Sequence, residues 1–331
     1  MSQHSLIAWS NEVPGTSWDD DLFARGGHFL QSTHWGAFNR QLGRKLFFGQ
    51  GPGWQCFAIL ERSNKATRLY CPYGPVAESM ESYELAIVEL KALAQDQGAI
   101  FVRMEPWAPL TKADLKRLKH RPALKEIQPS LVWLQDLTKP RDQIIKEMSK
   151  NNRQRYRNAA KAGVRIGASH DPGDVDALLM VVHEVAAHNH IIQHPDDYFR
   201  TMAQVLLPRD AATLYIARHH DEPVSAAIVF DSPTTRHVGH SGSMHAHRNV
   251  HPGAIMRATM VLDAQDRGQK TFDSLGVAPP GEPEHPWAGL TRFKLSFGGD
   301  YRYYLGTWEL PVSPLYHAYR SVYLAYSATR R

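Results

Sequence analysis

The chain has 331 residues, of which 43% are hydrophobic and 21% are charged, a composition typical of a globular protein with about two domains. Two cysteines are too few for a disulfide scaffold or a four-cysteine zinc site, and no segment approaches the roughly 18 apolar residues of a membrane-spanning helix. The net charge of +5 permits a nucleic-acid partner without requiring one.

In chain order, residues 1–20 lack the basic start and apolar run of a secretory signal, so we expect a cytoplasmic protein. Gln31-Ser32-Thr33 can cap a helix predicted over 35–42. Apolar residues at helical spacing predict a second helix over 82–97, which ends at Gly98. Strands are predicted over residues 56–61, 67–70 and 99–104.

The second half of the chain alternates more clearly between helices and strands. The longest candidate helix covers 143–162 and ends at Gly163. Further helices are predicted over 174–187, 195–207 and 251–267, and strands over 164–166, 213–218, 224–230 and 271–273. Two related α/β halves are the simplest interpretation of this order.

The predicted helix over 143–162 is strongly basic. Between residues 146 and 165 the chain has seven lysines and arginines and one acid, Glu147. Lys146, Lys150, Arg153 and Arg157 share one helical face, because they follow each other at i, i+4, i+7 and i+11. A solvated surface is one interpretation. A face of a single sign repels itself, however, and this favours a polyanion as its partner.

A single lysine lies between two phenylalanines in the segment 293–299, directly before a Gly-Gly pair. The local pattern by itself favours a strand-turn-strand with one snorkelling lysine. The alternative is a ligand site, in which the glycines permit close approach and the aromatic rings form a dry wall beside the lysine.

Many of the 18 histidines fall in residues 182–194 and 236–251, but their spacing does not indicate a metal site. There is no His-Glu-x-x-His motif, and His183 and His188 are five residues apart and therefore on different parts of a helix surface. We expect no metal.

Six blocks, taken together and in order, resemble the Fem family of FemX/FemAB-type peptidyltransferases. They are Gln31-Ser32-x-x-Trp35-Gly36, Tyr70-Cys71-Pro72-Tyr73-Gly74-Pro75-Val76, Val102-Arg103-Met104-Glu105-Pro106, the basic stretch over 137–164, Phe272-Asp273-x-x-Gly276-Val277 and Gly289-Leu290-x-x-Phe293-Lys294-x-x-Phe297-Gly298-Gly299. Each block alone is weak, but their order and spacing cover nearly the whole chain.

The resemblance implies an α/β (α+β) fold of two tandem GNAT-like domains. No sustained heptad run is present, so we expect the compact type without a coiled-coil arm. Residues 1–145, with a C-terminal helix over 314–331, would form the first domain and bind the acceptor. Residues 146–313 would form the second domain and hold the tRNA and its aminoacyl group.

The resemblance also implies an activity in cell-wall biogenesis. An amino acid would move from aminoacyl-tRNA to the side-chain amine of a peptidoglycan precursor, without a cofactor. This chemistry needs no enzyme nucleophile, because the donor is an activated ester, and the chain has no Gly-x-Ser-x-Gly elbow. The protein would position the reactants, remove a proton from the amine and stabilise the oxyanion.

The catalytic assignments follow from this resemblance. Lys294 matches the family lysine that meets the tRNA end or stabilises developing charge, and Phe293 would form a wall of the same site. Glu105 matches an acidic family position and would orient the amine or accept its proton. The alternative interpretation is that Glu105 forms a structural salt bridge with Arg103 at the strand end. The residues assigned to tRNA binding are Lys150, Arg153, Arg157 and Lys161.

Two positions depart from the compact family type. Asn39, beside Arg40, replaces a lysine expected four residues after Trp35, and His194 replaces an arginine expected four residues before Tyr198. Both changes weaken the clamping of a diphosphate. The acceptor is expected to be a lipid-linked or UDP-linked muropeptide, and weaker diphosphate clamping favours the lipid-linked form, or a different amine, over the UDP-linked one. A lipid-linked acceptor would bring the protein to the inner membrane face. The residues assigned to the acceptor are Trp35, Asn39, Arg40, Tyr73, Arg103, His194 and Tyr198.

Two other functions fit parts of the sequence. An acyl-CoA-dependent N-acyltransferase needs a glycine-rich loop before a helix, and the matching segment, 248–254, lacks the first glycine and carries Pro252, which has no amide donor. A non-catalytic nucleic-acid-binding protein would explain the basic helix but not the blocks in the first half of the chain.

Overall fold

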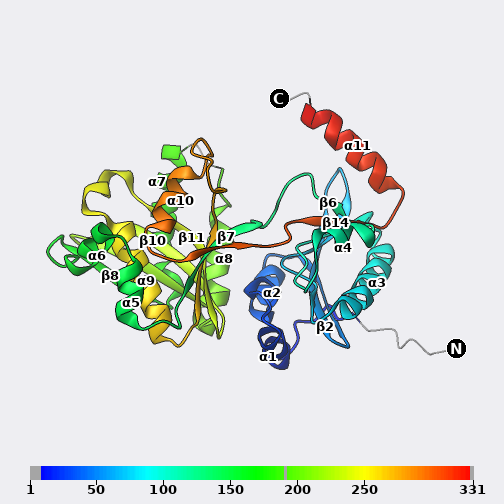
Figure 1. Cartoon of the computed structure of the whole chain (residues 1–331), viewed down its shortest axis with the longest axis horizontal. Helices are drawn as coiled ribbons and strands as arrows, with labels where there is room; N and C mark the ends of the chain where they lie inside the picture. The colour runs from blue at the N-terminus through cyan, green and yellow to red at the C-terminus, as the bar shows by residue number, and fades with distance from the viewer. Residues whose placement is uncertain (1–8, 190–191, 329–331) are drawn as a thin grey trace. The chain divides into compact units, whose positions relative to one another are not determined.

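The computed structural model describes residues 9–189 and 192–328, which form two compact units (Figure 1). Unit 1 contains the described residues up to Ser130 and from Tyr304 onward, and unit 2 contains Leu131–Tyr303. None of the described helices is long and apolar enough to cross a bilayer. The longest of them, α3, has 17 residues, so this part of the chain has no coiled-coil arm, as predicted.

Unit 1 is built on a seven-stranded sheet with the order β1-β2-β3-β5-β14-β6, in which β4 also pairs with β2. The strands are β1 (Lys45–Gly51), β2 (Trp54–Arg62), β3 (Thr67–Cys71), β4 (Val76–Ala77), β5 (Phe101–Met104), β6 (Arg121–Pro122) and β14 (Trp308–Pro311). The helices are α1 (Ser17–Ala24), α2 (Thr33–Gln41), α3 (Met80–Asp96), α4 (Lys112–Arg117) and α11 (Leu315–Ala328).

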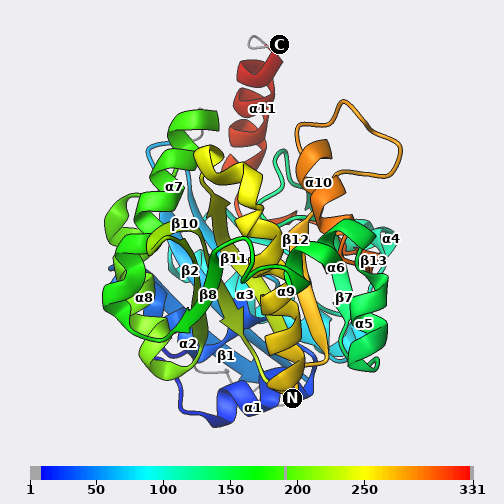
Figure 2. The same ribbon diagram turned by 90° about the vertical axis from the view of Figure 1, so that its left-hand side faces the viewer.

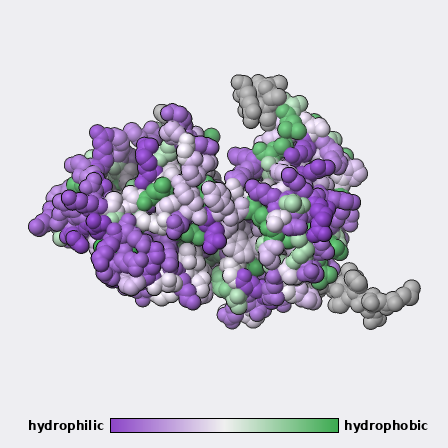
Figure 3. All heavy atoms as spheres, in the orientation of Figure 1, coloured by the Kyte–Doolittle hydropathy of each residue, from purple (hydrophilic) through white to green (hydrophobic). Residues whose placement is uncertain are grey.

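Alternating apolar residues give the unit 1 sheet a core on each face. Ala58 and Val102 belong to the large cluster beneath α3. Their neighbours point the other way, so that Phe57 packs with Trp18 of α1 and Phe101 packs with Tyr316 of α11. Part of the surface of α11 remains hydrophobic, as Figure 3 shows.

Unit 2 is built on a second seven-stranded sheet with the order β13-β7-β12-β11-β10-β9-β8. The strands are β7 (Leu131–Asp136), β8 (Val164–Ser169), β9 (Ala212–His219), β10 (Glu222–Asp231), β11 (Thr235–Ser243), β12 (Thr271–Gly276) and β13 (Asp300–Tyr303). The helices are α5 (Arg141–Glu147), α6 (Lys150–Arg157), α7 (Val175–Asn189), α8 (Asp196–Leu206), α9 (Pro252–Asp266) and α10 (Ala288–Leu295).

The helix α9 is the centre of the unit 2 core. Ten of its side chains are buried, and α6 packs beside it in front of the sheet (Figure 2). On β11, Ser243 lies close to Gly253 of α9, whereas its neighbour Gly242 contacts Val181 of α7. Since adjacent residues of a strand point to opposite faces, α9 and α7 cover opposite faces of this sheet.

The two units divide at other residues than the sequence predicted. Residues 131–145 begin with β7, which pairs with β12 and β13, so they belong to unit 2. Residues 304–313 contain β14, which pairs with β5 and β6, so they belong to unit 1. The C-terminal helix is present as Leu315–Ala328, and the last three residues of its predicted range lie outside the described residues.

The long basic helix predicted over 143–162 is wrong, because the chain forms two shorter helices there. Met148 has an extended conformation between α5 and α6. Ser149 then caps α6 by accepting a hydrogen bond from the backbone N–H of Asn152 at 3.3 Å. A serine at this position competes with a continuous helix by offering its hydroxyl to the backbone. Lys146 therefore lies on a different helix from Arg153.

The strand-turn-strand that the local pattern favoured around Lys294 is also wrong. Phe293 and Lys294 lie in the last turn of α10, and Gly298 and Gly299 connect this helix to β13. Both glycines have positive φ angles, 82° and 113°, which favour residues without a Cβ atom.

Candidate functional site

A group of buried polar side chains lies where β11 and β12 separate in unit 2. We call it the strand-end cluster, and its members are Gln135, His237, Arg257, Asp273, Ser274 and Lys294. The two strands run parallel and pair at three positions, of which His237 with Asp273 is the last. β11 continues to Ser243 paired with β10 alone on this stretch. The sheet therefore opens at the carboxyl end of its parallel pair, where α/β proteins commonly bind ligands.

A local irregularity in β12 directly follows the last residue that pairs with β11. The register between β12 and β7 shifts between Asp273 and Gly276. Within the shift, Leu275 has a positive φ of 60°, and its N–H donates to Oδ1 of Asp273 at 2.7 Å. The Asp273 carboxylate thus stabilises the backbone turn at the point where pairing between β12 and β7 is interrupted.

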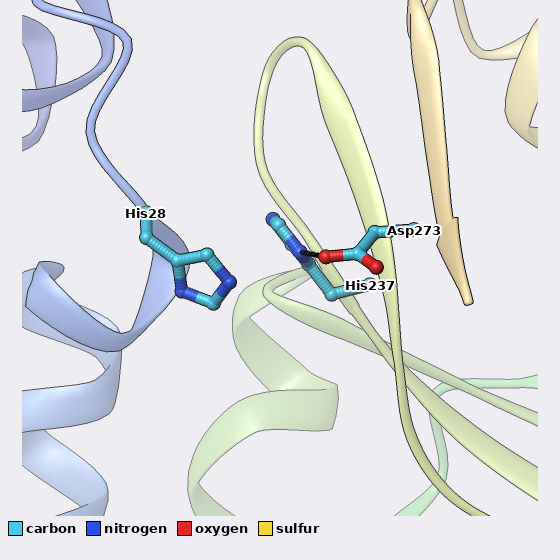
Figure 4. Close-up of side chains that lie close together, drawn as sticks. All are labelled: His28, His237 and Asp273. Atoms are coloured by element: carbon cyan, nitrogen blue, oxygen red, sulfur yellow. Dashed lines mark hydrogen bonds and ion pairs between the residues drawn. The ribbon is translucent and has the colours of Figure 1, made fainter. Parts of the chain in front are cut away.

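The other carboxylate oxygen of Asp273 faces the imidazole of His237. Figure 4 shows the two side chains pointing toward each other from β12 and β11, with 3.1 Å between Oδ2 and Nδ1. Both side chains are buried. The pair fixes the orientation of the histidine ring at the point where the strands part.

Arg257 brings a buried positive charge to the cluster from the middle of α9. One of its terminal nitrogens donates to Oγ of Ser274 and to Oε1 of Gln135, and its guanidinium lies 4.2 Å from the centre of the Phe272 ring. Its Nε has no hydrogen-bond partner among the described residues. Burial lowers the pKa of Arg257 to about 9, against the opposing effect of Asp273, so the group remains charged at neutral pH.

Lys294 brings the second cation. Its side chain is 9% exposed, and Nζ donates to the carbonyl oxygen of Gly276 at 2.6 Å. Burial lowers the pKa of Lys294 to about 8, repulsion from Arg257 adds to this, and Asp273 opposes it. The ammonium group is thus mostly protonated at neutral pH but gives up its proton more readily than an exposed lysine.

Phe293, the predicted wall of the same site, has a different environment from Lys294. Its ring is 38% exposed and meets the Phe297 ring edge-on, with 5.2 Å between centroids. Successive residues of a helix project about 100° apart, so the two side chains leave α10 in different directions.

A polar pocket of about 450 Å³ lies beside the start of α9. It is lined by Asn151, Gln154, Arg155, Asn158, Ala162, Asn249, Val250, His251 and Ile255. His251 precedes the helix with a positive φ of 50°, and burial together with the charge of Arg155 lowers its pKa. The pocket therefore combines a cation, several amides and a histidine that favours its neutral form.

The residues assigned to tRNA binding do not line this pocket. Lys150, Arg157 and Lys161 are exposed. The guanidinium of Arg153 instead donates to the carbonyl oxygen of Lys146 at 2.8 Å and to that of Met148. These bonds cap the carboxyl end of α5, which gives Arg153 a structural role.

In unit 1, Glu105 is a buried carboxylate with four hydrogen bonds. Oε1 accepts from the hydroxyl of Thr307 at 2.7 Å and the N–H of Gln128 at 3.4 Å, and Oε2 accepts from the hydroxyl of Tyr70 at 3.1 Å and the N–H of Tyr73 at 3.4 Å. Burial raises the pKa of Glu105 to about 7 despite these bonds.

The predicted alternative for Glu105, a salt bridge with Arg103, is wrong. Arg103 lies opposite Glu309 in the β5–β14 ladder and forms its ion pair there at 2.5 Å. Glu309 also accepts from the hydroxyl of Tyr316 at 2.8 Å, so Arg103 helps to connect the sheet to α11. This buried pair gives Arg103 a structural role.

The other unit 1 residues assigned to the acceptor are largely engaged within the fold. Asn39 is fully buried, donates to the Trp35 carbonyl oxygen at 2.8 Å and accepts from Arg44 at 2.7 Å. Trp35 packs against Phe38, with 4.9 Å between ring centroids. Arg40 pairs with Glu12 at 2.6 Å.

Tyr73 is buried beside Glu105. Its ring lies against His28 and Trp107, with 4.0 Å and 5.6 Å between ring centroids. Its φ of 47° directs the backbone N–H to the Glu105 carboxylate.

His194 and Tyr198 meet in unit 2. Their rings stack with 4.0 Å between centroids, and both contact His240 edge-on. His194 and His240 line a pocket of about 540 Å³. Burial lowers the pKa of His240 to about 4, and the neighbouring His194 adds to this effect.

Five of the six members of the strand-end cluster had no role in the sequence-based assignment: Gln135, His237, Arg257, Asp273 and Ser274. Arg257 carried the clearest signal, because it is the single charged residue between Ala254 and Leu262, a stretch of helix that is apolar apart from Arg257 and Thr259. A charge at such a position must be buried with a partner or serve a ligand. Asp273 belonged to a quoted block, but only the register shift shows what it does.

Comparisons with known proteins agree with this architecture. Residues 146–303 match the family model described as "Acetyltransferase (GNAT) domain". No curated protein sequence matches the chain. Among solved structures, FemX is similar with a TM-score of 0.81 and 16% identity over 94% of this chain and 99% of FemX.

Two further solved structures share the fold. L-PGS from Bacillus licheniformis has a TM-score of 0.61 and 13% identity over 95% of this chain and 97% of its own. A tandem GNAT protein from the clavulanic acid biosynthesis pathway has a TM-score of 0.51 and 12% identity over 93% and 99%. The predicted fold, two tandem GNAT-like domains of the FemX type, is confirmed.

Proposed function

We propose that this chain is a Fem-type aminoacyltransferase, which moves an amino acid from aminoacyl-tRNA to the side-chain amine of a peptidoglycan precursor. The observation that carries the proposal is the pair of buried cations, Lys294 and Arg257, at the point where β11 and β12 separate. Buried positive charge beside an opening in the sheet suits a reaction in which negative charge develops on an oxygen.

The reaction needs little covalent help from the protein. The acceptor amine attacks the ester carbonyl carbon, a C–N bond forms, and the ester C–O bond breaks. The leaving ribose oxygen gains a proton and the amine loses one. Lys294, with a pKa lowered to about 8, is suited to give its proton to the ribose oxygen and to regain a proton from solvent.

Arg257 would act as a fixed positive charge beside Lys294. Its contacts with Ser274, Gln135 and the Phe272 ring hold the guanidinium in place. Preorganised charge in a dry site stabilises an oxyanion more strongly than mobile charge in water.

Glu105 is our proposed ligand of the acceptor amine in unit 1. A buried carboxylate whose pKa is raised to about 7 is suited to accept a proton at neutral pH. Its four hydrogen bonds hold both oxygens in place, which would fix the direction of that transfer.

The exposed cations Lys150, Arg157 and Lys161 support a polyanionic donor, because they leave α6 and the following turn strongly basic. The names of two structural neighbours, FemX and L-PGS, are consistent with an aminoacyltransferase but show only the fold at these identities. Lipid-linked and UDP-linked muropeptides are the acceptors to be compared.

The full chain can be tested with tRNA that carries a labelled amino acid and with either type of muropeptide. We expect label in the muropeptide and a much lower yield with Lys294→Ala. If neither muropeptide gains label while acetyl-CoA is consumed in the presence of an amine, the proposal is wrong.

A second candidate, an acyl-CoA-dependent N-acyltransferase, is favoured by one observation. The 450 Å³ pocket at the start of α9 contains Arg155 and His251 next to a helix amino terminus. Pro252, however, is the first residue of this helix and has no N–H to offer a pyrophosphate. Release of free CoA thiol on mixing the protein with acetyl-CoA and a primary amine would favour this candidate.

A further inference from the structure

The C-terminal helix α11 presents an apolar stripe that unit 1 does not bury completely. Its members follow the spacing i, i+3, i+4, i+7 and i+8, which is typical of a helix face made for burial. They are Leu315, Ala318, Tyr319, Val322 and Tyr323. Leu315 is 64% exposed and Val322 is 70% exposed, and Figure 3 shows hydrophobic atoms at the surface of this helix.

This stripe lines an apolar groove of about 550 Å³. The opposite wall comes from Ile100, Ala66 and Lys65. Two of the groove residues, Tyr319 and Tyr323, have rings with one polar end, a type enriched where proteins meet the headgroup layer of membranes.

A second groove, of about 460 Å³, also reaches α11 through His317. Its other lining residues are Ile87, Val88, Lys91, Lys116, Leu118, Lys119, Arg121, Leu310 and Pro311. Lys91, Lys116, Lys119 and Arg121 are exposed, and none of them forms an ion pair with a residue that the structure describes. No aspartate or glutamate lines either groove.

We propose that these two grooves and the stripe of α11 form a docking surface for an anionic lipid bilayer. Exposed aliphatic side chains can enter the headgroup layer, while the four neighbouring cations attract its negative charge. Stable peripheral attachment usually needs both an apolar and a basic signal, and this surface supplies the two together. The proposal does not depend on the proposed transferase activity.

Charge argues for a bilayer over the other occupants. In a symmetric dimer, both subunits would use this same surface. The four cations of one subunit would then lie close to the four cations of the other and repel them. A nucleic acid would use the cations but would leave Leu315 and Val322 without a role, since base stacking uses aromatic or guanidinium planes.

The test is flotation of the full chain with two kinds of vesicle, one of phosphatidylcholine alone and one with a third of it replaced by phosphatidylglycerol. We expect binding to the phosphatidylglycerol vesicles alone, weakening as salt is added. Each basic residue near such a surface is worth about a fivefold change in partition coefficient. The double variant Lys116→Glu/Lys119→Glu should therefore reduce binding by at least about 25-fold.

Matched controls separate this surface from net charge and from general exposure. Lys125→Glu/Lys270→Glu changes the same number of exposed lysines elsewhere and should leave binding within about twofold of the wild type. Val322→Glu should weaken binding, whereas Met180→Glu, at a residue 52% exposed in unit 2, should not.

Four results would overturn the proposal. The wild type could fail to float with phosphatidylglycerol vesicles. Lys116→Glu/Lys119→Glu and the control Lys125→Glu/Lys270→Glu could lose binding equally, which would show that vesicle binding depends on net charge and not on this surface. Val322→Glu could convert a dimer to a monomer in light scattering, or Lys116→Glu/Lys119→Glu could lose tRNA binding, with vesicle binding unchanged in either case. These last outcomes would assign the surface to a second copy or to RNA.

Discussion

Nζ of Lys294 donates a 2.6 Å hydrogen bond to the carbonyl oxygen of Gly276, which ends β12. This bond connects the last turn of α10 to the strand that leaves the parallel ladder. It holds the ammonium group beside Arg257, and no carboxylate of the described residues is its direct partner. The lysine is therefore oriented by a neutral oxygen and keeps its positive charge available to a ligand.

Replacing Lys294 by alanine should lower the rate of aminoacyl transfer by about 10²–10³-fold, the usual effect of removing one oxyanion-stabilising group. The fold should persist, because α10 and β12 keep their apolar contacts. Single-turnover transfer and circular dichroism measure the two effects. Lys270→Ala, at an exposed lysine of unit 2, is the control. Wild-type rates in Lys294→Ala would give the lysine a purely structural role.

The alkaline limb of the pH–rate profile should report Lys294. Activity should fall as pH rises through about 8, because Lys294 then loses its proton. Repulsion from Arg257 contributes to this low pKa, so Arg257→Met should lower the rate and move the limb to higher pH. Arg62→Met, at an exposed arginine, should leave the profile unchanged. If the alkaline limb of Arg257→Met stays at the wild-type pH, Arg257 does not influence the group whose proton loss ends activity.

Glu105 should make stability depend on pH. Its pKa rises from 4.5 in the unfolded chain to about 7 in the fold, so the folded state binds the extra proton between these values. The contribution of Glu105 to the free energy of unfolding should therefore be greatest below pH 4.5. It should fall by about 3 kcal/mol as pH rises from 4.5 through 7.

Denaturant unfolding of the wild type and Glu105→Gln at several pH values isolates this contribution. Glutamine has no proton to lose there, so the difference between the two proteins should shrink or change sign in favour of the variant at high pH. Parallel curves for the two proteins would show that Glu105 does not titrate in this window.

Reversing the charges of Lys150 and Arg157 should weaken tRNA binding and reduce its salt dependence. Two lost phosphate contacts lower the slope of log K against log salt by about 1.5–2. Arg153 is unsuitable for this test, because it caps α5 and its loss would disturb the turn before α6. Lys125→Glu/Lys270→Glu again serves as the control, and equal slopes in all proteins would place the tRNA elsewhere.

Sequence patterns predicted the elements whose signals are local. Ser32 caps α2 as expected, and the apolar spacing of α3 fixed its length to within two residues. Lys294 was found from its block. The break at Ser149 was missed, because a strong helical charge pattern continues across it.

The strand-end cluster could not be predicted as a group, for a physical reason. Arg257, Ser274 and Lys294 come together only because the β12 register shifts and α9 packs on the sheet. Such contacts depend on tertiary packing and leave no periodic signal in the chain. The Arg103–Glu309 pair joins residues 206 positions apart and was hidden for the same reason.

The position of β14 has a consequence for synthesis on the ribosome. This strand lies between β5 and β6 in the unit 1 sheet, yet it follows all of unit 2 in the chain. The unit 1 sheet therefore stays incomplete between β5 and β6 until the 173 residues Leu131–Tyr303 have been synthesised. Unit 2 can form its sheet without any later segment, and it should be the first part of the nascent chain to become resistant to protease.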